Sequence, residues 1–147
     1  MPPKTFGNTM NPALAAALLK AQNDLVIAAR MSHWNVRGMN FYEAHLLFGR
    51  VYETASGRVD DLVEVLRGLG YDPTFEEFSG PGGALPSYSC QDLVRALIGL
   101  ATTYYAALVS LRDAARDDAM SAGLVNLLED LAQDCTVVLY LLSSAQV

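Results

Sequence analysis

The placement of the helix-breaking stretches limits what this chain can fold into more than any other feature of its sequence. Four long segments carry apolar residues at helical spacing, and they cover residues 11–36, 41–69, 90–116 and 121–144. In the first of them Leu14, Leu18 and Leu25 fall on one face of a helix. No segment shows the alternation of a strand with comparable strength. The sequence therefore predicts an all-α fold built from four helices.

The links between these segments differ in length, and the difference selects a topology. Two links are short, whereas residues 71–88 form a long link that holds three of the six prolines. Short links join antiparallel neighbours in a bundle, and a long link crosses between two helical hairpins. We expect a four-helix bundle with a long crossover between its second and third helices. Residues 72–78 within the crossover could form one short helix.

Residues at the segment ends predict where helices begin. Asn11 followed by Pro12 is typical of an N-cap and a first helical turn. Asn40 is expected to cap the second helix. Ser89 and Asp92 have the spacing of a capping box at the start of the third.

Size and composition fit a single soluble domain. With 147 residues and 52% apolar side chains, the chain can bury one core, and residues 1–10 are expected to be a short extension. Two cysteines are too few for a disulfide scaffold and form no CxxC pair. No apolar run approaches the ~18–20 residues of a membrane span, and the first residues lack the core of a signal peptide. We expect a cytoplasmic protein without a membrane partner.

The charge is uneven along the chain. The net charge is −6, and residues 71–147 carry ten Asp and Glu against three Lys and Arg. An acidic surface repels phosphate backbones and attracts cations. Metal cations are therefore better candidate partners than nucleic acids.

Both histidines of the chain lie in one short segment. His33 falls near the end of the first predicted helix and His45 near the start of the second. One interpretation is that they are partly buried and satisfied by hydrogen bonds. The other is that they meet across the tight turn and bind a metal.

Carboxylates follow further along the second predicted helix. Asp60 and Glu64 are four residues apart, so they share a helical face and could hold a divalent ion. The alternative is a solvated patch that pairs with Arg58 or Arg67. His45 and Asp60 are 15 residues apart, which is roughly 22 Å along a continuous helix. They cannot bind one ion within a chain, but two copies packed antiparallel about a two-fold axis would bring them together.

The segment from His33 to Gly70 resembles the signature of the Dps family, the mini-ferritins first known as DNA-binding proteins from starved cells. The pattern is His-Trp-Asn-Val-Arg-Gly-x-Asn-Phe-Tyr, with a second histidine twelve residues after the first. The resemblance implies a ferritin-like bundle that assembles into a hollow homododecamer. It also implies a ferroxidase that takes up Fe(II), oxidises it, preferably with hydrogen peroxide, and stores ferric mineral.

The same resemblance implies where the ferroxidase centres lie. His33 and His45 of one subunit would face Asp60 and Glu64 of its mate at each two-fold interface. Trp34 would stand beside the site, suited to quenching stray radicals; a packing tryptophan at a helix turn is the alternative. We expect the four ligands to bind one divalent ion firmly and a second one weakly.

One ligand of the family pattern is missing. An acidic residue usually follows the second histidine by four positions, where this chain has Gly49. Two imidazoles and two carboxylates also suit zinc, so Zn²⁺ is a second candidate metal. Gly49→Asp is expected to speed iron oxidation if position 49 faces the site.

The acidic second half has counterparts in the family too. Asp113 and Asp118 match positions that line acidic three-fold pores for iron entry, and the neighbouring Asp117 could share that task. A solvated helix end is the alternative. DNA binding is not expected, because Lys4 is the only basic residue before Asn11 and residues 142–147 contain none.

Three functions remain open at this point. The first is an iron-oxidising and iron-storing mini-ferritin. The second is a Dps-like shell that sequesters metal with a degraded ferroxidase site, as Gly49 suggests. The third is a helical interaction protein in which both histidines only pack.

Overall fold

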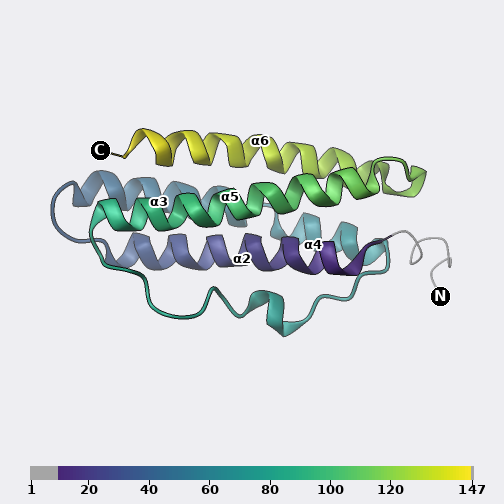
Figure 1. Cartoon of the computed structure of the whole chain (residues 1–147), viewed down its shortest axis with the longest axis horizontal. Coiled ribbons are helices and arrows are strands. Elements are labelled where there is room, and N and C mark those ends of the chain that lie inside the picture. Colours follow the sequence, from purple (N-terminus) through teal and green to yellow (C-terminus); the bar gives the residue numbers. More distant parts are fainter. Residues whose placement is uncertain (1–9, 147) are drawn as a thin grey trace.

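A computed structural model describes residues 10–146, and this part of the chain forms an all-α bundle (Figure 1). Its elements are α2 (Pro12–Asn35), α3 (Phe41–Ser56), α4 (Val59–Gly68), the 3₁₀ helix η1 (Phe75–Phe78), α5 (Cys90–Ala115), the 3₁₀ turn η2 (Ala119–Ser121) and α6 (Ala122–Ser144). The predicted four-helix bundle is confirmed, with helix ends within one or two residues for three of the four segments. Of the expected extension over residues 1–10, only Met10 lies within the described residues.

The predicted second helix is in fact two helices, α3 and α4. Gly57 and Arg58 separate them, and Arg58 has non-helical backbone angles (φ −125°, ψ 22°). Glycine is a weak helix former, and the Arg58 side chain is held by ion pairs with Asp61 (3.2 Å) and Asp130 (3.6 Å). The expectation of one continuous helix over 41–69 is therefore wrong.

The predicted caps hold in part. The Asn11 side chain accepts a hydrogen bond from the Leu14 amide (3.1 Å), as expected. Ser89 likewise accepts from the Asp92 amide (3.2 Å), but Asp92 does not return the bond as a capping box requires. Its carboxylate instead accepts from the Ser87 hydroxyl (2.7 Å).

Asn40 does not act as the predicted side-chain cap. It occupies the N-cap position of α3, but its side chain makes no capping hydrogen bond and its backbone is left-handed (φ 64°). Asparagine tolerates this conformation better than most residues. Together with Gly38 (φ 89°) it reverses the chain between α2 and α3.

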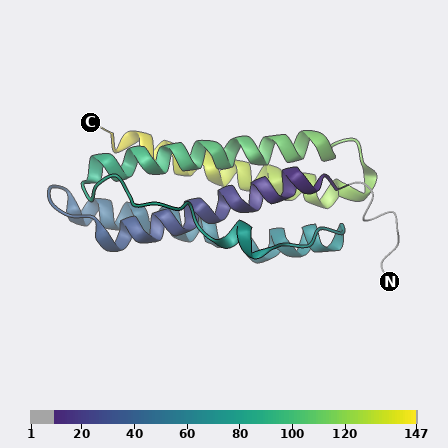
Figure 2. The ribbon, with the colours of Figure 1, turned by 60° about the horizontal axis from the view of Figure 1, so that its bottom comes forward.

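The crossover runs back along α2 to the far end of the bundle, as Figures 1 and 2 show. It has to span this length because α4 and α5 run in the same direction. The short helix predicted over 72–78 is present as η1. Glu77 of η1 is buried at 4% exposure, and it closes a capping box with Thr74 that the sequence analysis did not identify.

The helices bury a leucine-rich core that includes Leu18, Leu62, Leu97 and Leu128. Among the described residues, α5 is the one helix long and apolar enough to cross a membrane by length and composition. Its leucines at 93, 97 and 108 are fully buried in the bundle. Its apolar character is therefore that of a core helix.

Candidate metal centre

His33 and His45 come together at the end of the α2–α3 hairpin. His33 lies in the last turn of α2, and His45 lies one turn into α3. The left-handed residues of the intervening turn fold α3 back onto α2. The two imidazoles stack, with ring centroids 3.9 Å apart and planes 14° apart.

Each ring is held by the backbone of the other residue. The His33 Nδ1 donates to the His45 carbonyl oxygen (2.7 Å), and the His45 Nδ1 donates to the His33 carbonyl oxygen (2.7 Å). A carbonyl only accepts, so these bonds place a proton on Nδ1 of each ring. Nε2 of a neutral ring then carries the lone pair that a metal would need. The hydrogen-bonded interpretation is therefore confirmed for Nδ1 of each ring, and metal binding by Nε2 stays a prediction.

The stacking geometry bears on how many ions the pair could hold. A ligating imidazole keeps its ion near the ring plane, about 2.1 Å from the nitrogen. Because the planes are nearly parallel and the centroids are 3.9 Å apart, an ion at that distance from both Nε2 atoms would lie well outside both planes. The geometry favours one ion for each imidazole over a single ion shared by both.

Trp34 is not a packing tryptophan within this chain, because 62% of its surface is exposed. The Arg30 guanidinium lies 5.7 Å from its ring centroid and 4.2 Å from the ring centroid of Tyr52. Arg30 also donates a hydrogen bond to the Tyr52 hydroxyl. This cluster was not predicted from the sequence, although Arg30 and Trp34 are one helical turn apart.

The predicted carboxylate ligands are exposed on α4. Asp61 pairs with Arg58 (3.2 Å), and Arg67 pairs with Asp72. Among residues 10–146, no ion pair or side-chain hydrogen bond involves Asp60 or Glu64. Asp60 and Glu64 are therefore solvent-exposed, as the solvated-patch interpretation expects, but within residues 10–146 Arg58 and Arg67 pair with other carboxylates.

The histidine pair and the carboxylates lie far apart in one chain. Figure 1 shows the start of α3 at one end of the bundle and α4 towards the other. Within the described part of the chain, no group of three or more His, Cys, Asp or Glu side chains could hold a metal. The two halves of the predicted site can therefore combine only between chains.

Gly49 lies against the histidine pair, one helical turn after His45. A Cβ atom added at this position would stand 3.1 Å from both Cε1 and Nδ1 of His33. Position 49 thus faces the predicted site. The first group that a side chain there would meet is the imidazole itself.

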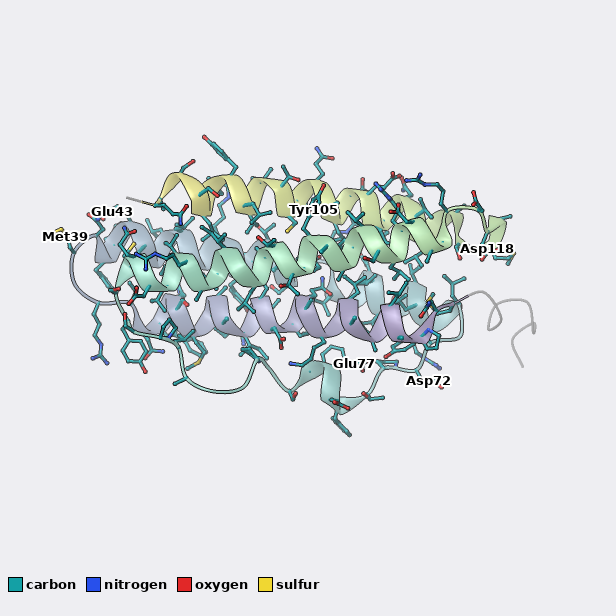
Figure 3. The ribbon with its side chains drawn as sticks, in the orientation of Figure 1. Met39, Glu43, Asp72, Glu77, Tyr105 and Asp118 are labelled. Atoms are coloured by element: carbon teal, nitrogen blue, oxygen red, sulfur yellow. The ribbon has the colours of Figure 1, made fainter. Side chains whose placement is uncertain are left out.

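The predicted pore residues have local partners. Asp113 pairs with Arg112 (2.9 Å) and Arg116 (3.3 Å). Asp118 caps η2, accepting from the Met120 amide (3.2 Å) and the Ser121 hydroxyl (2.8 Å). Figure 3 shows Asp118 at the opposite end of the bundle from Met39 and Glu43, which lie near the α2–α3 turn.

Comparison with known proteins agrees with this fold. The family model of the ferritin-like domain matches residues 13–139. A DNA protection during starvation protein of Brevibacillus brevis is 39% identical over 64 residues, which is 41% of this chain and 43% of that protein. An uncharacterized protein of Haemophilus influenzae is 42% identical over 41 residues, or 28% of this chain and 26% of that protein. The chain thus aligns with less than half the length of these curated relatives.

Solved structures cover nearly the whole chain. A Dps protein from Bacillus brevis has a TM-score of 0.74 at 25% identity and covers 90% of this chain and 95% of its own. A mutant of Mycobacterium smegmatis Dps1 has a TM-score of 0.76 at 17% identity, with 98% of both chains covered. Helicobacter cinaedi CAIP has a TM-score of 0.75 at 18% identity and covers 91% of this chain and 99% of its own. The chain belongs to the ferritin-like family, as a member of its Dps group.

Proposed function

We propose that this protein is an iron-oxidising and iron-storing mini-ferritin of the cytoplasm, which removes Fe(II) and hydrogen peroxide together. Its working form is a hollow homododecamer with ferroxidase centres at the two-fold interfaces. The observation that carries the proposal is the histidine stack, whose Nδ1 atoms are fixed by backbone bonds and whose Nε2 atoms are free to bind metal. Membership of the Dps group supports it.

Each centre needs residues from two subunits. The Nε2 atoms of His33 and His45 bind Fe(II) as substrate, one ion at each ring. Asp60 and Glu64 of a second copy supply the negative charge, because carboxylates stabilise Fe(III) more than Fe(II). Within residues 10–146 these two carboxylates form no ion pair, so they can take up this role without breaking one.

The redox step is balanced by peroxide. Two Fe(II) ions each give one electron to hydrogen peroxide, the oxygen–oxygen bond breaks, and two protons complete two molecules of water. Trp34, next to His33 in sequence, is the electron donor for any radical that forms when only one ion is bound. The Arg30 guanidinium contacts both the Trp34 ring and the ring of Tyr52 in α3.

Iron reaches the interior through acidic three-fold pores in this proposal. Asp113 and Asp118 line them at the α5–α6 end of the bundle. The two arginines that pair with Asp113 offset its negative charge. We therefore include the neighbouring Asp117 among the residues that line the pore. Zn²⁺ competes with Fe(II) for the two-fold centres, since imidazole and carboxylate are ligands that zinc also prefers.

A second function is favoured by one observation, the glycine at position 49. Without an acid there, the ion at His45 has one protein ligand fewer. A shell that binds metal and oxidises it slowly, or not at all, would follow. Oxidation kinetics distinguish this sequestering shell from the mini-ferritin.

The test is anaerobic Fe(II) oxidation on addition of stoichiometric peroxide, followed by stopped-flow absorbance. Wild type is compared with His33→Ala, Asp60→Ala and the matched control Asp61→Ala, whose carboxylate pairs with Arg58. We expect the first two variants to lose the fast phase and the control to keep it. Equal rates for wild type and Asp60→Ala would contradict the shared centre. Slow oxidation in wild type itself would favour the sequestering shell.

A further inference from the structure

We infer that Gly49 positions His33: the absence of a side chain at residue 49 provides the space in which the His33 imidazole stacks on His45. The inference rests on the proposed metal centre and adds a residue to it. It also gives position 49 a different meaning from a lost ligand. Because residue 49 has no side chain, the His33 imidazole can occupy the position in which it stacks on His45.

The contact is close and specific. A Cβ at position 49 would lie 3.1 Å from Cε1 and 3.1 Å from Nδ1 of His33. The usual contact between carbon atoms is about 3.5–4.0 Å, so the ring would have to move by a few tenths of an ångström. Nδ1 is also the atom that donates to the His45 carbonyl at 2.7 Å.

The ring has little freedom to move and keep its contacts. On one side it already stacks on His45 at 3.9 Å between centroids. The His33 backbone is fixed in α2, where its carbonyl oxygen accepts from the His45 Nδ1 (2.7 Å). A displaced ring therefore has to lengthen its bond to the His45 carbonyl or widen its stacking on His45. In both cases its Nε2 lone pair loses its fixed direction.

Another helical glycine supplies the comparison. Gly99 lies in the interior of α5 and is exposed, and a Cβ added there would meet nothing within 4 Å. Alanine is a better helix former than glycine at both positions. Gly49→Ala and Gly99→Ala thus share the gain in helix propensity and differ in contact with an imidazole.

The first measurement is made without metal. Crystal structures of wild type, Gly49→Ala and Gly99→Ala are compared after light scattering has shown that all three assemble alike. In Gly49→Ala we expect the His33 ring to shift, so that the distance from its Nδ1 to the His45 oxygen exceeds the wild-type 2.7 Å or the ring centroids move apart beyond 3.9 Å. We expect Gly99→Ala to keep the wild-type geometry. A Gly49→Ala structure with both bonds and the stack intact would overturn the inference.

The second measurement follows metal binding by itself, with no turnover. Zinc is titrated by calorimetry, and Co²⁺ is used as a spectroscopic probe of imidazole ligation. Loss of a group that orients a ligating histidine typically weakens metal binding 10–100-fold. We expect a loss of about tenfold or more in Gly49→Ala, with altered Co²⁺ absorption bands, and none in Gly99→Ala. Equal zinc affinity in wild type and Gly49→Ala would contradict the inference.

Gly49→Asp separates this inference from the missing-ligand interpretation. If the glycine provides room, aspartate displaces His33 and metal binding weakens despite the added charge. If aspartate tightens zinc binding and leaves the His33 ring in place, position 49 lacks only a ligand and the inference is wrong. Failure of wild type to bind zinc or Co²⁺ at all would count against the proposed function, and the metal-free structures would still decide the role of Gly49.

Discussion

At the scale of single residues, the two nitrogens of each histidine have separate tasks, and substitution can separate them. The Nδ1 atoms join the end of α2 to the start of α3 through the two carbonyl bonds. The Nε2 atoms take no part in that connection. A side chain with a hydrogen-bond donor in the position of Nδ1 and no nitrogen in the position of Nε2 should therefore preserve the hairpin and remove the metal ligand.

His33→Asn is the variant that meets this requirement. Its amide nitrogen can take the place of Nδ1 and donate to the His45 carbonyl. We expect the thermal midpoint to fall by no more than a few degrees, as for a loss below ~1 kcal/mol. Iron oxidation should fall at least about tenfold, since a ligand is gone. Thermal unfolding and stopped-flow kinetics on one preparation check both effects, and an oxidation rate equal to that of wild type would show that His33 is no ligand.

Cys135 gives a residue-scale prediction away from the metal centre. Burial, with a smaller effect of the nearby Asp134 charge, raises the pKa of its thiol from 9.0 to about 12. The thiol also donates to the Ala101 carbonyl oxygen (3.4 Å). Because the thiolate is the reactive form, Cys135 in the folded protein should resist alkylation at about pH 8 and react rapidly once urea unfolds the chain.

The same pKa shift gives stability a definite dependence on pH. Below the unfolded pKa of 9.0 both states keep the proton, so the contribution of Cys135 to stability is complete. Between 9.0 and about 12 the unfolded state loses its proton first, so stability falls as the pH rises through this window. The thermal midpoint should decline over this range, and less steeply in Cys135→Ala. A flat profile in wild type would contradict the shift.

At the scale of elements, the caps of α2 and α3 use asparagine for two different physical reasons. Asn11 satisfies an amide of the first turn with its side chain, whereas Asn40 supplies a left-handed backbone and no side-chain cap. Asn11→Ala should cost about 1 kcal/mol by removing the cap. Asn40→Ala should cost a similar ~1–2 kcal/mol through the backbone.

Glycine substitutions distinguish the two causes. Asn40→Gly should be neutral or stabilising, because glycine adopts positive φ without a steric penalty. Asn11→Gly should cost only a few tenths of a kcal/mol, since glycine is accepted at N-caps. Chemical denaturation of the four variants tests both pairs. If Asn40→Gly destabilised the protein as much as Asn40→Ala, its side chain would have a role that the structure does not show.

Among the elements, the four-helix bundle and its crossover could be predicted from the sequence, and the break after α3 was not. Apolar spacing and the Pro-rich stretch 71–88 were sufficient for the bundle and its crossover, because both depend on patterns that extend over many residues. The break after α3 was not predicted, although Gly57 is a local signal for it. The ion pair of Arg58 with Asp130 of α6 accompanies the break. Such a contact between distant elements leaves no local signal.

The candidate site, like the fold, could be predicted from the sequence only in part. The spacing of His33 and His45 predicted their meeting correctly, because a tight turn places both at one end of a hairpin. The sequence could not show their stacking or the contact of Gly49 with the His33 ring, which depend on side-chain orientation. The pairing of the histidines with Asp60 and Glu64 of another copy remains a prediction.

At the scale of the whole molecule, the separation of the two half-sites makes assembly the first quantity to measure. We expect a homododecamer in solution, because each centre needs a second copy and the resemblance to the Dps family implies a shell of twelve. Light scattering of the purified protein at micromolar concentration checks this expectation. A monomer under these conditions would remove the basis of the shared centre, whereas a stable dimer would keep the centres and exclude the shell.

The net charge of the whole assembly predicts how the protein responds to DNA. Twelve copies at −6 each give a formal charge of about −72, which opposes binding to a phosphate backbone. We expect no retardation of plasmid in a gel-shift assay at neutral pH and moderate salt. The control is the same assembly with a Lys-rich N-terminal tail added, which should retard the plasmid. Retardation by the wild-type shell at near-stoichiometric amounts would contradict the prediction.

The reciprocal bonds between His33 and His45 also bear on the order of events after synthesis. The two residues are twelve positions apart and lie on adjacent helices, so their connection closes a short loop. A newly folded chain can therefore carry the imidazole half of a centre before it meets another copy. Under the proposed function, the carboxylate half arrives only with that copy. Pairing of two subunits would then be the event that switches iron oxidation on, and a lone subunit in the cell would be unable to start radical chemistry.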